Sequence, residues 1–128
     1  MTTELWTLIA VTLLCLALPL VYVPLYARQA GMGAVSSNRE DVPVAIGAAG
    51  RGARAHRNLL ENLLPFGIAV LAARAIGVSN TATLAGAWLF LVARVVHALS
   101  YFAGITGVRT LAYFAGVAGT VLIVTQLH

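Results

Sequence analysis

The stretch Leu5–Tyr26, LWTLIAVTLLCLALPLVYVPLY, contains no charged residue. About 20 consecutive apolar residues are enough to cross the hydrocarbon core of a bilayer as a helix. Thr110–Leu127 is also free of charge, and two further apolar stretches, approximately 59–78 and 81–102, lie between these two. Transmembrane barrel strands would need shorter segments of alternating hydrophobicity, which these stretches lack. The sequence therefore predicts an all-α integral membrane protein, a bundle of four helices that each cross the bilayer.

The composition of the 128-residue chain agrees with this prediction. Hydrophobic residues make up 60% of the chain and charged residues only 9%, whereas a soluble domain has about 45–50% and about 25% respectively. The length allows a single domain, 1–128. Its spans are expected at approximately 5–26, 54–76, 81–102 and 109–127. The first span should be retained, because no basic segment precedes it and it exceeds the usual apolar region of a cleaved signal.

All basic residues are arginines, and the formal net charge is +4. In a soluble protein this positive net charge would suggest a nucleic-acid partner. In a membrane protein the positions of the arginines instead indicate how the chain is oriented in the bilayer, so no nucleic-acid partner is expected. Arginine in place of lysine, with abundant Ala and Gly, is typical of a GC-rich genome, which favours a bacterial inner membrane. The first and third loops share six arginines, whereas the opposite side has only Arg74. The positive-inside rule then places those loops in the cytoplasm and both termini outside.

Ionisable residues inside spans are costly, and they usually mark a functional site. The second helix begins, the third ends and the fourth begins on the cytoplasmic side, so their polar residues are expected at one depth, with the outer half of the bundle apolar. Spacings of three, four and seven residues place such residues on one helical face. The three sets are Arg54, Asn58 and Glu61; Arg94, His97 and Tyr101; and Arg109, Thr110 and Tyr113.

These side chains suit a small zwitterion with more carboxylates than amines. Guanidinium groups bind carboxylates in bidentate fashion, Glu61 can hold an ammonium group, and Asn58 both donates and accepts. A metal site is not expected, because few ligating residues lie among many arginines. Simpler interpretations remain open: Glu61 and Arg94 can form a structural ion pair, and arginines at helix ends, such as Arg28, can extend to the lipid headgroups.

Two blocks of sequence resemble the MAPEG family, the membrane-associated proteins of eicosanoid and glutathione metabolism. Arg51–Asn62, RGARAHRNLLEN, is similar to the motif of the second helix of that family. Arg94-Val-Val-His97 with Tyr101, followed by Arg109-Thr-Leu-Ala-Tyr113, resembles the third and fourth helices. The closest likeness is to the microsomal glutathione transferase and microsomal prostaglandin E synthase branch.

This resemblance implies a homotrimer that binds glutathione between neighbouring subunits, near the cytoplasmic side. It also implies an enzyme, a glutathione transferase or peroxidase, whose lipophilic electrophile reaches the bound thiol from the surrounding lipids. Arg109 and Thr110 would face the sulfur as the catalytic residues. The residues that would bind glutathione are Arg57, Asn58, Glu61, His97, Tyr101, Arg109 and Tyr113. Arg28 would also bind it, although the sequence around Arg28 matches the family pattern poorly.

The sequence departs from the family pattern at Thr110, where the prostaglandin synthase-like members carry Ser, and at Asn62, where some relatives have an aromatic residue. The family also contains a member that binds lipid without catalysis, so a non-catalytic binding protein is the main alternative. A small transporter is disfavoured, because a conducting path needs polar groups across the full depth. On the last span, the pairs Ala112/Gly116 and Ala115/Gly119 favour close helix packing.

Overall fold

The computed structural model describes all 128 residues as four long helices and one short helix, without a strand. The chain is an integral membrane protein, since three of the long helices are long and apolar enough to cross a membrane. The remaining long helix, α3, has charged residues in its first half that lower its hydropathy. The bounds are α1 Thr3–Ala30, α2 Met32–Ser36, α3 Gly47–Ala75, α4 Thr81–Ala103 and α5 Thr106–Val124.

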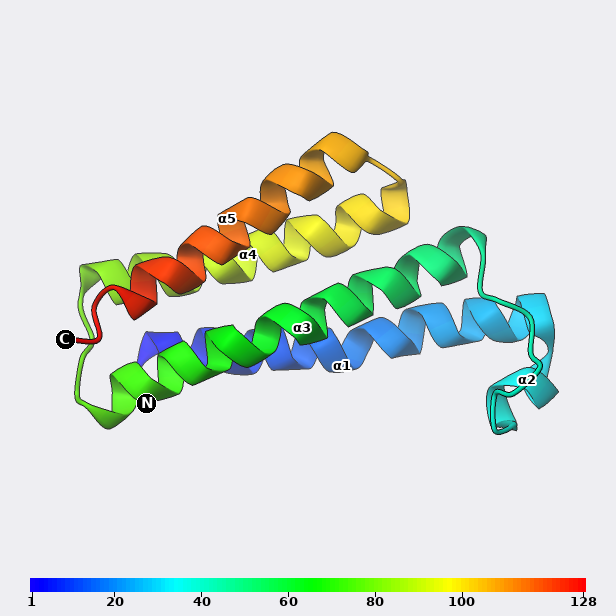
Figure 1. Ribbon diagram of the computed structural model, residues 1–128, viewed down its shortest axis with the longest axis horizontal. Helices are drawn as coiled ribbons and strands as arrows, with labels where there is room; N and C mark the ends of the chain where they lie inside the picture. The colour runs from blue at the N-terminus through cyan, green and yellow to red at the C-terminus, as the bar shows by residue number, and fades with distance from the viewer.

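The long helices form two antiparallel pairs, α1 with α3 and α4 with α5 (Figure 1). Helix α4 packs on both α1 and α3, and α5 contacts α3 but not α1. Both termini and the α3–α4 turn lie at one end of the bundle, whereas α2 and the α4–α5 turn lie at the other (Figure 1). The start of α3, the end of α4 and the start of α5 therefore share one end, which we call the loop end.

Three helices extend beyond the apolar stretches that predicted them, and α3 begins at Gly47 rather than near residue 54. Helix α1 continues past Tyr26 to Ala30 and ends at Gly31, whose φ of 85° suits glycine and whose N–H donates to the carbonyl of Ala27. Helix α5 begins at Thr106 rather than near Arg109. Hydropathy reports the part of a helix that lies in lipid, whereas the backbone hydrogen bonds continue into the interfacial region. Helix α2 was not expected, because its five residues carry no periodic apolar pattern.

The core lies where α1, α3 and α4 meet. The rings of Phe66 and Phe90 stack with centroids 3.8 Å apart and an angle of 4° between their planes. Helix α1 contributes Val11, Cys15 and Leu18 to the same buried cluster. This packing fixes α4 against α3 one turn before Arg94, and so positions the polar residues farther along α4.

Helices α4 and α5 approach so closely that their backbones touch. A Cβ atom added to Gly119 would lie 2.6 Å from the carbonyl oxygen of Gly86 and 2.9 Å from the nitrogen of Phe90. The pair Ala115/Gly119 predicted close helix packing. In the structure, Gly119 of this pair makes the close contact, and its partner is α4 of the same chain.

The end of the bundle that holds the termini is not apolar, contrary to the sequence-based expectation. The carboxylate of Glu4 is only 6% exposed and accepts hydrogen bonds from the hydroxyls of Thr83 at 2.7 Å and Ser79 at 2.9 Å. Asn80 and Thr83 also form a capping box at the start of α4. The expectation was wrong because Glu4 precedes the apolar stretch, and only the folded chain brings the α3–α4 turn back against it.

The Gly119→Ala substitution should destabilise the protein by about 1–3 kcal/mol, because the added methyl group has backbone atoms on its path. Gly107→Ala is the matched control in the same helix, since nothing lies within 4 Å of its Cβ position. Thermal unfolding in detergent, followed by circular dichroism, measures the difference. Equal stability of the two variants would contradict the close contact between α4 and α5.

Candidate binding cavity at the loop end

A cavity of about 290 Å³ lies where α3, α4 and α5 meet at the loop end. Six of the residues predicted for the site line it, together with Phe114, which was not predicted. The six are Asn58 from α3, His97 and Tyr101 from α4, and Arg109, Thr110 and Tyr113 from α5. The start of α3, the end of α4 and the start of α5 were expected to bring polar residues to one depth. In the structure, polar residues from all three line this one cavity.

Aromatic contacts hold the cationic group of this cavity. The guanidinium of Arg109 lies over the ring of Tyr101, 4.7 Å from its centroid, which is a favourable cation–π distance. The rings of His97 and Tyr101 pack edge to face at 5.1 Å, and the ring of Tyr113 lies 6.5 Å from that of His97. The rings of Tyr101, His97 and Tyr113 form one wall of the cavity, which we call the aromatic wall. Because His97 is buried, this wall is held in place by the surrounding helices, and it orients Arg109.

Behind this wall lies Arg94, whose side chain is only 1% exposed. Its guanidinium donates to the side-chain oxygen of Asn58 at 3.1 Å, to that of Asn62 at 3.4 Å and to the backbone carbonyl of Tyr113 at 3.3 Å. It also lies 5.0 Å from the centroid of the Phe90 ring. Arg94 thus joins α3, α4 and α5 without a carboxylate.

The ion pair between Glu61 and Arg94, one of the interpretations left open by the sequence, does not form. Glu61 is exposed on α3, whereas Arg94 is bound by the two asparagine amides and the carbonyl. The two residues differ in this way because Asn58 and Asn62 occupy the face of α3 that turns towards α4, and Glu61 lies between them in sequence on another face.

The bond from Arg94 determines what Asn58 offers to the cavity. A guanidinium can only donate, so it binds the amide oxygen of Asn58 and leaves the amide N–H groups for the cavity. The lining then supplies the N–H groups of Arg109 and Asn58 and the hydroxyls of Tyr101, Tyr113 and Thr110, and it includes no carboxylate. Such a surface suits a ligand that presents anionic groups.

Thr110 is exposed at the cavity, but its hydroxyl donates to the carbonyl of Thr106 at 3.1 Å. This bond to the preceding turn is common for hydroxyl side chains in helices. To donate to a ligand, the hydroxyl must share its hydrogen or turn away from that carbonyl. The guanidinium of Arg109, by contrast, lines the cavity without a hydrogen bond to another group of the chain, so its N–H groups are available to an anion.

Three predicted site residues do not line this cavity. Arg57 lies beside a second cavity on the other side of α3, and Glu61 is exposed between the two. Arg28 is exposed near the end of α1 and lines neither space. The single chain therefore assembles one part of the predicted site and leaves the other part on its surface.

The sequence did not assign a role to Asn62 or Gly116. The amide of Asn62 donates to the carbonyl of Asn58 at 2.8 Å and accepts from Arg94, and its spacing of four residues from Asn58 was the available signal. Gly116 leaves room for Arg94, since a Cβ atom there would lie 2.7 Å from Nε of Arg94. The carbonyl of Tyr113 could not be found from sequence, because every residue has one.

The family model described as MAPEG family matches residues 5–127 of the chain. A search of curated proteins and a search of solved structures each found no match. The matched region includes all four long helices almost completely and every residue of the cavity.

The Arg94→Ala substitution should destabilise the folded protein by about 3 kcal/mol, because it opens a cavity and leaves the partly buried amide oxygens of Asn58 and Asn62 without their donor. Arg74→Ala removes an exposed arginine near the end of α3 and should change stability by less than about 0.5 kcal/mol. Denaturant unfolding in detergent measures both. A difference of less than 1 kcal/mol between them, well below the roughly 3 kcal/mol expected from these losses, would refute the network assigned to Arg94.

Proposed function

The chain belongs to the MAPEG family, and from that premise we propose that it binds glutathione in the cavity lined by α3, α4 and α5. Members of this family generally bind glutathione. The observation that carries the proposal is the donor-rich lining without a carboxylate, at the place where Asn58 and Arg109 face one space. Glutathione has two carboxylates and one amine, so most of its charged groups are ones this lining can bind.

Glutathione then lies along the start of α3, with its thiol towards α5. The N–H groups of Asn58 and the guanidinium of Arg57 bind its carboxylates, and Glu61 accepts from its ammonium group. Arg57 and Glu61 are both exposed, and they follow one another closely along the surface next to Asn58. They can therefore contact a ligand that extends out of the cavity without a change in the helix.

The chemical role of the site is to activate the thiol. A free thiol has a pKa near 8.5, and lowering it by about two units requires roughly 2.7 kcal/mol in favour of the anion. One guanidinium at about 4 Å can contribute up to ~4 kcal/mol at an effective dielectric constant of 20. Arg109 alone is thus sufficient, and the hydroxyl of Thr110 can add a further donor once it leaves the carbonyl of Thr106.

The activated thiolate attacks a lipophilic electrophile that enters from the bilayer. A sulfur–carbon bond forms, and either a leaving group departs with its electron pair or a conjugated acceptor takes up a proton. The protein acts in this account as a glutathione transferase with its site on the cytoplasmic side. The location in the membrane brings the enzyme to substrates that partition into lipid.

A non-catalytic glutathione- or lipid-binding protein of the same fold is the second candidate. The observation that favours it is the hydrogen bond from Thr110 to Thr106, which takes up the hydroxyl that was expected to assist Arg109 at the sulfur. Binding without thiolate formation would support this candidate.

We also propose that the protein assembles into the homotrimer implied by its family. Glu61 and Arg57 are exposed on α3 next to Leu60 and Leu64, which are 49% and 68% exposed. A charged side chain that faces lipid is costly, by about 2.5–3.5 kcal/mol for several residue types at the centre of a span. A neighbouring subunit would cover this face and complete the glutathione site between two chains.

Wild-type protein with bound glutathione should show thiolate absorbance at neutral pH. Because the bound anion is stabilised, the thiol pKa is lowered, and the thiolate should disappear only as pH falls through the lowered value. Arg109→Gln should return the pKa towards 8.5, a rise of about two units, while Arg74→Gln should not change it. An ultraviolet difference titration, with turnover of a model electrophile in parallel, measures this. Full thiolate formation in Arg109→Gln would show that the assigned role is wrong.

The assembly is tested by the mass of the protein in detergent, obtained by light scattering with the detergent contribution subtracted. We expect a trimer, and covalent cross-links between α3 of neighbouring chains near Leu64. A purely monomeric protein that still binds glutathione through Asn58 would contradict a site formed between two subunits. The proposal that glutathione binds in the cavity of the single chain would then still hold.

A further inference from the structure

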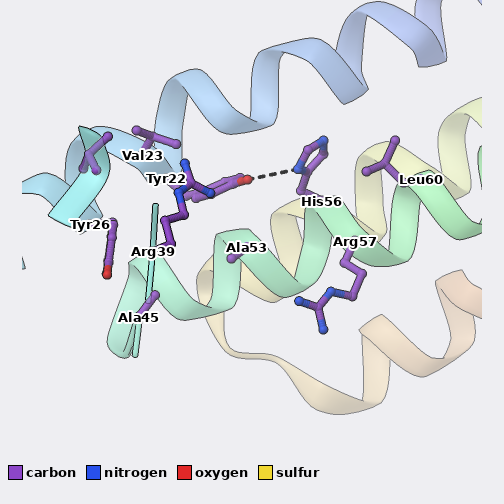
Figure 2. Close-up of a pocket in the computed structure, with 10 residues that line it drawn as sticks. Tyr22, Val23, Tyr26, Arg39, Ala45, Ala53, His56, Arg57 and Leu60 are labelled. Atoms are coloured by element: carbon purple, nitrogen blue, oxygen red, sulfur yellow. Dashed lines mark hydrogen bonds between the residues drawn. The ribbon is translucent and has the colours of Figure 1, made fainter. Parts of the chain in front are cut away.

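A second cavity, of about 360 Å³, lies between α1, α2, the segment after α2 and the first half of α3 (Figure 2). It shares no lining residue with the glutathione cavity, but Arg57, which lines it, is also the exposed residue proposed above to bind a glutathione carboxylate. Its polar lining consists of Tyr22 and Tyr26 from α1, Arg39 from the connecting segment, and His56 and Arg57 from α3. The other lining residues are aliphatic, and none is acidic.

The polar groups of this cavity are arranged to donate. The hydroxyl of Tyr22 lies 3.0 Å from Nδ1 of His56 (Figure 2). When this hydroxyl donates to a neutral imidazole, the ring hydrogen resides on Nε2, which becomes a second donor. The cavity is lined by two guanidinium groups, those of Arg39 and Arg57, and by the imidazole of His56, and its lining includes no carboxylate to neutralise them.

Hydrogen bonds fasten the wall of the cavity that the connecting segment forms. Tyr26 donates from its hydroxyl to the carbonyl of Pro43 at 2.6 Å. Gln29 donates to the carbonyl of Val44 at 2.9 Å and accepts from the N–H of Ile46 at 3.1 Å. The segment is thereby held against the end of α1, so the cavity exists without a ligand.

Arg39 has a φ of 62°, in the left-handed region that arginine rarely adopts. Its N–H donates to the hydroxyl of Ser37 at 3.1 Å, which helps to hold this conformation. An unfavourable backbone conformation persists only where its surroundings maintain it, and such residues are concentrated at binding sites. Glu40 and Asp41 follow Arg39, and both are exposed and outside the lining.

We propose that this second cavity is a phosphate-binding site that holds the headgroup of an anionic phospholipid. Guanidinium groups bind phosphate oxygens through paired N–H groups, and the aliphatic walls suit the glycerol and first methylene groups. The cavity lies at the loop end, where basic residues meet the negative cytoplasmic leaflet and tyrosines are enriched at the headgroup level. The phosphate could also come from a soluble anion, and the experiment separates the two sources.

The test uses the full-length protein in detergent, titrated with short-chain phosphatidylglycerol, short-chain phosphatidylcholine or inorganic phosphate. The rise in the unfolding temperature reports binding, and calorimetry gives Kd. Arg39→Gln is compared with Arg74→Gln, since both variants remove one exposed arginine, but only Arg39 lines the cavity. Circular dichroism verifies that both variants are folded.

We expect saturable binding of phosphatidylglycerol, weaker binding of phosphatidylcholine, and a Kd raised about tenfold by Arg39→Gln, the loss of about one charge-assisted hydrogen bond. Arg74→Gln should bind as wild type does. If inorganic phosphate binds as tightly as the lipid and depends on Arg39 equally, the phosphate site stands and the lipid source is refuted. Absence of binding, or equal binding by the two variants, overturns the proposal. Glutathione binding should be unchanged in Arg39→Gln, which keeps this site separate from the proposed function.

Discussion

A positive charge buried where three helices meet constrains the loop end of this bundle. The guanidinium of Arg94 is removed from solvent, and taking a charge out of water is expensive unless several groups bind it. Here the binding groups are the amides of Asn58 and Asn62 on α3 and the carbonyl of Tyr113 on α5. The Nε–H of Arg94 has no partner, so these three groups are the ones that bind the buried charge, and their places fix the register of α3, α4 and α5 at this depth.

The same constraint prepares the cavity for which glutathione binding is proposed. Because Arg94 binds the oxygen of Asn58, the asparagine presents its N–H groups, and because α5 is held close, Arg109 is placed over Tyr101. Preorganised donors lose little freedom when an anion binds, which is how a small site can favour a thiolate. The buried arginine thus acts on the ligand through the asparagine, while Arg109 would touch the ligand itself.

The long helices and the meeting of polar residues at one end could be predicted, because uncharged stretches and spacings along a helix are local properties of the sequence. The burial of Glu4 could not, since it depends on the hydroxyls of a distant turn. In the sequence Asn62 is only a departure from the family pattern, whereas in the structure its amide oxygen accepts a hydrogen bond from Arg94. The exposure of Glu61 and Arg57 likewise reflects which face of α3 turns to α4, and helical spacing alone does not decide between neighbouring faces.

Calorimetric titration of glutathione into the purified full-length protein tests the central claim most directly, namely that the cavity at Asn58 and Arg109 is a glutathione site. We expect saturable binding by the wild type that is weakened by Asn58→Leu and unaffected by Arg74→Gln, which replaces an arginine at the opposite end of α3. Absence of glutathione binding by a folded wild type, or binding that Asn58→Leu leaves intact, would contradict it.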